Sequence, residues 1–111
     1  MIVEYGSVFA ILDQHPVTPG HHLVITKRHA RDYFDMSFNE KRDAEALLTL
    51  LRKKLLEDDP TVKGFNVGMN SGEVAGQTVM HAHIHLIPRR EGDVEHPRGG
   101  VRGCVPGKMG Y

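Results

Sequence analysis

The sequence predicts a small α+β domain, in which several short strands accompany one long amphipathic helix. Three observations carry this prediction. Residues 80–88 alternate histidine with apolar residues, residues 37–58 place leucines at helical spacing, and residues 7–12, 22–26 and 65–70 form short strand-like runs. With 111 residues and a mass of 12.4 kDa, the chain has the size of one domain.

Residues 80–88 are predicted to form a β-strand because His81, His83 and His85 recur with a period of two. The three imidazoles would then share one face, about 6.5–7 Å apart along the strand. The apolar residues between them would pack on the other face: Ala82, Ile84 and Leu86.

The predicted helix begins with a capping box formed by Ser37 and Glu40, in which each side chain satisfies a free amide of the first turn. It ends at residues 58–60, where Asp, Asp and Pro follow one another. One apolar stripe runs along it: Ala44, Leu47, Leu48, Leu51 and Leu55. We interpret this stripe as core.

A single domain is expected over residues 1–111, with a core at about 6–89 and a C-terminal tail at 90–111. The tail is polar and rich in Gly, Pro and Arg, so it should not build a core of its own. We expect it to lie over the body, reach a second copy or stay mobile. A short second helix is also expected.

The composition of the chain argues against several classes of function and of cellular location. Lys+Arg and Asp+Glu both number 14, so no basic excess indicates nucleic-acid binding. Cys104 is the single cysteine, which fits a reducing compartment. No apolar run is long enough to span a bilayer and no signal peptide is evident, so we expect a cytoplasmic protein with no membrane partner. The small core makes association with a second copy plausible.

The three histidines of residues 80–88 admit three interpretations. They could be structural, although three imidazoles in register are hard to explain that way. They could bind a metal, because two histidines at i, i+2 on a strand can share a zinc ion. They could also act in nucleophilic catalysis, because neutral imidazole can attack phosphorus when its neighbours orient it. The residues alone leave the last two open.

The polar loop before the histidines bears on this choice. It offers neutral amides, hydroxyls and permissive backbone, which can place N–H groups around a phosphate without a cation. The residues concerned are Asn70, Ser71, Gly72, Gly76, Gln77 and Thr78. The loop lacks the Gly-Lys-Ser/Thr ending of a P-loop, which excludes a Walker-type nucleotide site.

Together these features resemble the histidine-triad (HIT) family of nucleotide hydrolases and transferases. The family pattern His-φ-His-φ-His-φ-φ, where φ is apolar, is met by residues 81–87, and residues 76–79 match its usual lead-in. Residues 12–13 together with residues 19–25 look like the first two core strands of the family. The likeness extends over about residues 8–89.

The resemblance implies a role for each of four histidines. His83 would be the nucleophile that attacks the α-phosphorus and forms a nucleotidyl-imidazole intermediate, which water then cleaves. His85 would contact the scissile phosphate and assist the leaving group. His81, together with His21, would hold the strand and keep the His83 ring in the correct tautomer.

The resemblance also implies how substrate would bind. Asp13 would accept hydrogen bonds from the ribose hydroxyls, with Ile11 and Leu12 near the base. Phosphate oxygens would be contacted by the loop: Asn70, Gly76, Gln77 and Thr78. No cofactor is expected beyond Mg²⁺ carried by the substrate.

The fold implied is an antiparallel sheet of about five strands with helices, usually paired into a homodimer. The activity implied is hydrolysis of an adenosine nucleotide, with diadenosine polyphosphates as the leading substrate class. A nucleoside phosphoramidase, a nucleotidyl transferase or phosphorylase, and a non-catalytic nucleotide-binding module remain alternatives, and a metal-storage or metal-sensing protein is a further one.

Two stretches of the sequence bear on whether the chain binds zinc and on which branch of the family it resembles. Many prokaryotic members begin with a Cys-x-x-Cys that helps to bind structural zinc, and this sequence has no such pair, so we expect no metal. Residues 97–103 resemble the tail of a prokaryotic branch often described as dinucleoside-polyphosphate hydrolases. In that tail, Arg98 and Arg102 would reach the distal phosphates.

Overall fold

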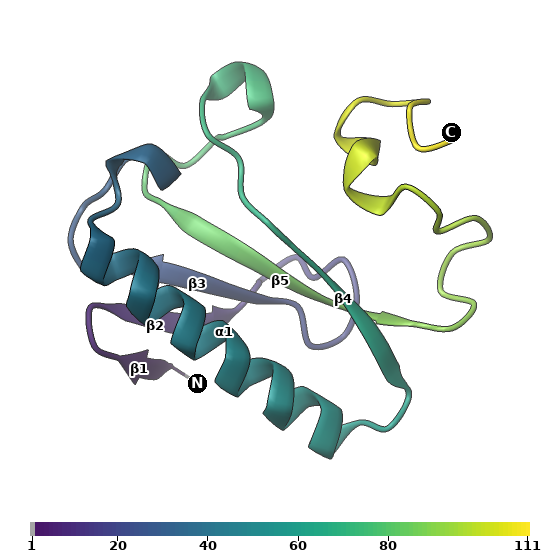
Figure 1. Cartoon of the computed structure of the whole chain (residues 1–111), viewed down its shortest axis with the longest axis horizontal. Helices are drawn as coiled ribbons and strands as arrows, with labels where there is room; N and C mark the ends of the chain where they lie inside the picture. The colour runs from purple at the N-terminus through teal and green to yellow at the C-terminus, as the bar shows by residue number, and fades with distance from the viewer. Residues whose placement is uncertain (1) are drawn as a thin grey trace.

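The computed structural model describes residues 2–111. Its strands are β1 (Val3–Tyr5), β2 (Val8–Leu12), β3 (His22–Thr26), β4 (Val62–Gly68) and β5 (His83–Arg90). They form one antiparallel sheet in the order β1-β2-β3-β5-β4, and the helix α1 (Phe38–Asp58) lies across one face of it (Figure 1). The predicted five-stranded antiparallel sheet with one main helix is confirmed. The short helical elements are single 3₁₀ turns: η1 (Tyr33–Asp35), η2 (Glu73–Ala75) and η3 (Gly100–Cys104).

The strand at residues 22–26 is correctly predicted, and the other strand limits shift by one to three residues. The strand β1 was not predicted, because three residues that include Glu4 give too weak a pattern. It pairs with β2 through a turn at Gly6, whose φ of 54° suits glycine. Asp43 of α1 accepts hydrogen bonds from the backbone N–H (2.9 Å) and the hydroxyl (2.7 Å) of Ser7, which ties this turn to the helix.

The predicted capping box of α1 is confirmed. The Ser37 hydroxyl accepts from the Glu40 N–H, and the Glu40 carboxylate accepts from the Ser37 N–H. The same carboxylate binds Arg28 through two hydrogen bonds of 2.8 and 3.1 Å. These partners lower the pKa of Glu40 to about 2, with the Arg28 hydrogen bond as the largest cause. The helix start is therefore fixed to the segment that follows β3.

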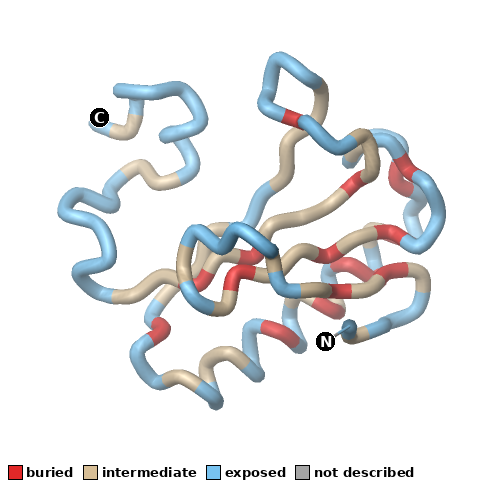
Figure 2. The backbone as a smooth tube through the Cα atoms, turned by 180° about the vertical axis from the view of Figure 1, so that it is seen from behind, coloured by how far each residue is buried: buried red, intermediate tan, exposed pale blue. Residues whose placement is uncertain are grey.

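The two faces of the sheet differ in burial. Along β2 and β3, buried residues alternate with half-buried ones, and the buried ones face α1 (Figure 2). The predicted leucine stripe of the helix packs into this core, with Leu48 and Leu55 at its margin. The core joins sheet and helix: Val8, Ala10, Val24, Leu86, Ala44, Leu47 and Leu51. In the part of the chain that the structure describes, no helix covers the other face of the sheet (Figure 1).

The C-terminal tail is more ordered than the sequence suggested. Both Arg98 and Arg102 lie over the Tyr111 ring, each with its guanidinium carbon 4.8 Å from the ring centre. Gly99 has a φ of 89°, and a side chain there would collide with the backbone of Met109. The tail therefore curls back on itself next to β4, as the yellow segment of Figure 1 shows.

No helix within residues 2–111 is long and apolar enough to cross a membrane.

Candidate active site

The uncovered face of the sheet carries two neighbouring imidazoles. His83 lies opposite Ile25, and His85 lies opposite Leu23 of β3. The ring centres of the two histidines are 5.4 Å apart, with 67° between the ring planes. Because β5 begins at His83, the alternation of the strand places both rings on the same face.

His81 departs from the prediction, because it precedes β5 and is not part of the strand. The N–H of Ala82 donates to the carbonyl of Ala30 at 2.7 Å, so the chain here pairs with the segment after β3. The His81 Nε2 lies 2.7 Å from the carbonyl oxygen of Thr26, and the ring packs edge-on against His29 with centres 5.2 Å apart. His81 thus fixes the entry to the strand. Together with His83 it still lines one small cavity of about 300 Å³.

The hydrogen bonds of His21 and His85 set their tautomers. The backbone N–H of Val17 donates to Nδ1 of His21 at 3.1 Å, so the proton of a neutral His21 is on Nε2. That Nε2 lies 2.9 Å from Nδ1 of His85, which must then accept. A neutral His85 therefore carries its proton on Nε2. This residue can donate a hydrogen bond to a substrate.

His83 has the opposite tautomer. Its Nδ1 lies 2.7 Å from the backbone carbonyl oxygen of His81, and a carbonyl can only accept. The proton of a neutral His83 is therefore on Nδ1, which leaves the lone pair of Nε2 free. The expectation that His21 orients the His83 ring is wrong, because His21 contacts His85 and the carbonyl of His81 holds His83.

Burial keeps the His21 and His85 rings neutral. The pKa of His85 is lowered by burial first, and then by the neighbouring His21 and His83, while Asp13 acts in the opposite direction. Burial also lowers the pKa of His21, against the raising influence of Asp13. Since the ordinary value is 6.5, both rings are neutral at pH 7, as the hydrogen-bonded chain requires.

Asp13 lies beside the contact between His21 and His85, with its Oδ2 3.5 Å from Nε2 of His21. Asp13, His21 and His85 offer ligand atoms within 4.8 Å of one another, so they could in principle hold a metal. However, the two histidine nitrogens are 2.9 Å apart, whereas two nitrogens on a tetrahedral zinc ion would be roughly 3.3 Å apart. The distance fits a hydrogen bond better than a shared ion.

The loop before β5 is held by Gln77. Its buried amide donates to the carbonyls of Arg31 (2.6 Å) and Val79 (3.1 Å), and its oxygen accepts from the N–H of Gly72 at 2.8 Å. With its polar atoms used in this way, Gln77 positions the loop. Its predicted phosphate contact finds no support in this arrangement.

The remaining predicted residues divide between the two sides of the sheet. Ile11 lies opposite Leu23 on the histidine face. Leu12 lies opposite His22 on the other side of the sheet, so the structure does not bring Leu12 to His83 and His85. Two loop residues border a cavity beside His85, namely Asn70 and Gly76, and Thr78 is exposed.

Sequence reasoning missed two supports of the site. Thr26 is buried on the apolar side of β3, and its carbonyl anchors His81. A polar residue at a buried position of the strand was the available signal. The other support is the N–H of Val17, which sets the tautomer of His21. The sequence gives no sign of this contact, because it is a backbone group that a turn brings to the His21 ring.

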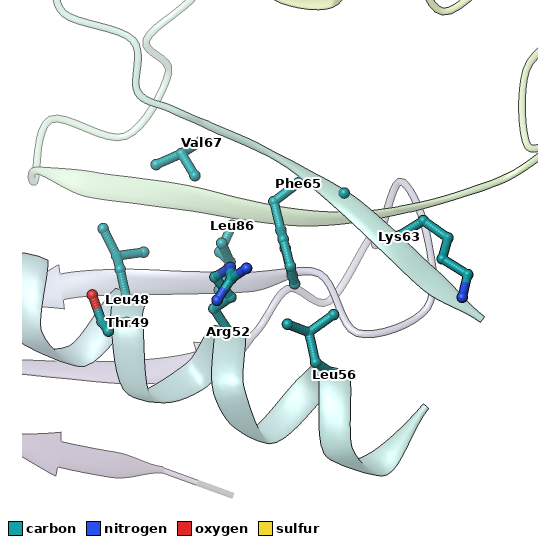
Figure 3. Close-up of a pocket in the computed structure, with 9 residues that line it drawn as sticks. Leu48, Thr49, Arg52, Leu56, Lys63, Phe65, Val67 and Leu86 are labelled. Carbon is teal, nitrogen blue, oxygen red and sulfur yellow. The ribbon is translucent and has the colours of Figure 1, made fainter. Parts of the chain in front are cut away.

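A separate groove of about 450 Å³ contains no histidine. It lies between α1 and β4, and Figure 3 shows Leu48, Leu56 and Phe65 directed into it. Arg52 and Lys63 also line it. It lies on the α1 side of the sheet, whereas His83 and His85 lie on the opposite face, so we treat it as separate from the candidate active site.

Comparison with known proteins identifies the family. The model of the HIT domain family matches residues 1–92. The chain belongs to the HIT domain family. It is similar to an uncharacterised HIT-like protein of Mycoplasma genitalium, at 38% identity over 92 residues that make up 81% of this chain and 63% of that protein.

Two further relatives have names that state an activity. One is the adenosine 5'-monophosphoramidase HNT1 of Candida albicans, 31% identical over 81% of this chain and 61% of that protein. The other is the asymmetrical bis(5'-nucleosyl)-tetraphosphatase of Schizosaccharomyces pombe, 37% identical over 76% of this chain and 46% of that protein. This chain thus spans about half to two thirds of the length of these three relatives.

Among solved structures, a zinc-bound histidine triad family protein from Mycobacterium smegmatis superposes with a TM-score of 0.76. It is 37% identical, over 83% of this chain and 66% of that one.

Proposed function

We propose that this protein is a nucleotide hydrolase that cleaves at the α-phosphorus of an adenosine nucleotide through a covalent intermediate on His83. One observation carries the proposal. On one face of the sheet, His83 has a free Nε2 lone pair, while His85 beside it has an Nε2–H to donate. A nucleophile and a donor with complementary tautomers are what displacement at phosphorus requires.

In the first step, the Nε2 lone pair of His83 forms a bond to the α-phosphorus. The bond from phosphorus to the leaving oxygen breaks, and its electron pair goes to that oxygen. The Nε2–H of His85 donates a hydrogen bond to the departing oxygen and stabilises its developing charge. The carbonyl of His81 accepts from Nδ1–H of His83 and stabilises the positive charge that the ring acquires.

In the second step, water adds its oxygen to phosphorus and loses a proton to solvent. The phosphorus–nitrogen bond breaks, its electron pair returns to His83, and the nucleoside monophosphate leaves. The chain through His21 keeps the proton of His85 on Nε2 in both steps.

The neutral state of His85 favours one class of leaving group. A phosphoric anhydride leaves as a stable oxyanion and needs only a hydrogen bond. An amine needs a full proton, which a buried histidine with a lowered pKa supplies less readily. This supports anhydride substrates, with diadenosine polyphosphates first, and is consistent with the tetraphosphatase named among the relatives. The phosphoramidase is the second candidate, because a relative bears that name.

Asp13 is proposed to bind the ribose, with Ile11 near the base. The Asp13→Ala variant should raise KM more than it lowers kcat, because a ribose contact exists in the ground state and the transition state alike. A hydrogen bond to a charged acceptor contributes about 1.5–3 kcal/mol, which corresponds to a KM raised about 10- to 150-fold. Steady-state kinetics with an unchanged KM would remove Asp13 from the ribose site.

The proposal is tested by product analysis in H₂¹⁸O. Diadenosine tetraphosphate should give AMP and ATP with the label in AMP, because water attacks the α-phosphorus. Adenosine 5'-phosphoramidate is assayed in parallel as the rival substrate. Label in ATP, or no turnover of either compound, would contradict the proposal. Loss of turnover with a chelator in Mg²⁺-free buffer would support a protein-bound metal instead.

We also propose that the chain acts as a homodimer in a reducing compartment such as the cytoplasm. The strand β4 lies at an edge of the sheet, where unpaired backbone groups can bind a second strand. The groove of Figure 3, which has apolar residues and the cations Arg52 and Lys63 in its lining, borders that edge. Cys104 is free, which suits reducing conditions. Light scattering should give about twice the 12.4 kDa chain mass, and the monomer mass at micromolar concentration would refute the dimer.

A further inference from the structure

Another cavity, of about 590 Å³, lies beside His85, on the far side from the cavity that His81 and His83 line. We call it the tail cavity, because the C-terminal tail forms one of its walls. Its floor includes Ile87, which follows His85 on the same face of β5. The loop before β5 contributes Val74 on one side. On the other side the tail contributes Val101 and Val105 from η3 and the residue that follows it.

The tail is held in this position by a chain of contacts. Asp93 binds Arg89 through two hydrogen bonds of 2.8 and 2.9 Å. Arg89 in turn donates to Asn66 of β4 at 2.7 Å. The Asn66 amide lies against Gly100, where an added Cβ would be 3.0 Å from its nitrogen. The first residue of η3 is therefore seated on the uncovered face of the sheet.

The lining of this cavity is chemically distinctive. Apart from the titratable His85, no lining residue carries a charged side chain. Val74, Val101 and Val105 are at least half exposed, so the cavity has apolar walls that nothing else within residues 2–111 covers. Its valine walls offer a phosphate chain no cationic side chain. It suits an uncharged, largely apolar group, and the volume lies in the range of small-molecule sites.

We propose that η3 and the residue after it build a subsite for the nucleoside on the leaving group, with Val101 and Val105 as specificity-determining residues. The inference rests on the function proposed above. The departing oxygen lies next to His85, which borders the cavity, and the phosphate chain that follows this oxygen in the leaving group carries the distal nucleoside toward the apolar walls. A dinucleoside polyphosphate places one nucleoside on each side of the histidine pair. A mononucleotide leaves the tail cavity empty.

The test compares two substrates with the same phosphate chain. Diadenosine tetraphosphate and adenosine 5'-tetraphosphate differ only in the distal nucleoside, and both release AMP by attack at the α-phosphorus. We expect the wild-type kcat/KM to be about tenfold or more higher for the dinucleotide, a ratio typical of one well-filled apolar subsite. Val101→Asp and Val105→Asp should bring the ratio close to one by lowering only the dinucleotide value.

Val94→Asp is the matched control. Val94 is also an exposed valine of the C-terminal region, but it lines a different cavity, with Lys63 and Glu91. This variant should keep the wild-type ratio. Activity on adenosine 5'-tetraphosphate reports folding in every variant, and light scattering reports the oligomeric state.

The outcomes separate the two proposals. Wild type that cleaves neither substrate overturns the proposed function and the subsite with it. Wild type that cleaves both with a ratio near one overturns the subsite alone. Equal loss of both activities in Val101→Asp and Val105→Asp, with or without a change of oligomeric state, also overturns the subsite, because the tail would then support the fold or a second copy.

A binding measurement gives a second readout. Cys104 is the only cysteine of the chain and lines the tail cavity, so its alkylation by iodoacetamide reports occupancy. In His83→Ala, which prevents turnover, diadenosine tetraphosphate should slow alkylation. Adenosine 5'-tetraphosphate at equal saturation should not. Equal protection by both compounds would contradict the subsite.

Discussion

The same strands present two different faces, and the contrast separates folding from function. Toward α1, Val24 and Leu86 are buried in a closed core. On the opposite side, Leu23 and Ile25 are equally apolar but only half-buried, and they lie beside His85 and His83. Apolar side chains that no helix of residues 2–111 covers, next to oriented imidazoles, support the proposal that the substrate binds on this face.

The difference teaches that residues one position apart can serve separate purposes. The covered face stabilises the fold by removing apolar surface from water. The uncovered face keeps its apolar surface available and uses backbone carbonyls and N–H groups to orient histidines. Substitutions on the two faces should therefore separate stability from activity.

The largest effect is expected at the nucleophile. His83→Ala removes the Nε2 lone pair, so kcat should fall at least about 10⁴-fold while nucleotide binding persists. The melting temperature should stay close to that of the wild type, because His83 lies on the uncovered face. Substantial residual turnover through AMP release would contradict the role of His83.

His85→Ala should have a smaller effect that depends on the leaving group. Loss of the donor should cost about 10²–10⁴-fold with diadenosine polyphosphate and much less with an activated leaving group, which needs no stabilisation. Steady-state rates on both kinds of substrate measure the difference. An equal loss of rate on both kinds of substrate would show that His85 does not assist the leaving group.

A pair of leucines tests the contrast directly. Leu47 is fully buried on the covered side, so Leu47→Ala should lower the free energy of unfolding by about 2–5 kcal/mol. Leu23→Ala, the matched change on the histidine face, should cost clearly less stability and should raise KM. Denaturant unfolding and kinetics on both variants provide the measurement. Equal destabilisation would show that the histidine face is part of the core.

The smallest expected effect is on the pH dependence of stability. The pKa values of His21 and His85 are lowered in the folded state, so the unfolded chain binds more protons once the pH falls below about 6.5. This contribution to stability is fully present above pH 6.5 and is lost as the pH falls below 6.5 through the lowered pKa values of the folded state. The melting temperature should decline over this range. A rise would contradict the neutral chain.

Much of the fold follows from local patterns. The alternation around His83, the capping box of Ser37 and Glu40, and the leucine stripe each encode their element within a few residues. The strand β1 escaped prediction because its partner and the Asp43 contact are set by the tertiary fold. The order of the tail escaped for a similar reason, because it depends on Asn66, distant in sequence.

The structure brings the predicted histidines close together, but with partners that the sequence did not predict. The motif picks out His81, His83 and His85, yet it does not reveal that His81 leaves the strand or that His21 contacts His85 rather than His83. Those relationships depend on register and on a turn that brings Val17 to the His21 ring. Sequence spacing alone does not contain them.

The central claim is that His83 carries the nucleotidyl group, and rapid quenching tests it most directly. Wild type mixed with α-³²P-labelled nucleotide and quenched within one turnover should carry a base-stable, acid-labile label. Peptide mapping should place that label on His83, and His83→Ala should carry none. A label on another residue, or turnover without any labelled protein, would contradict the account.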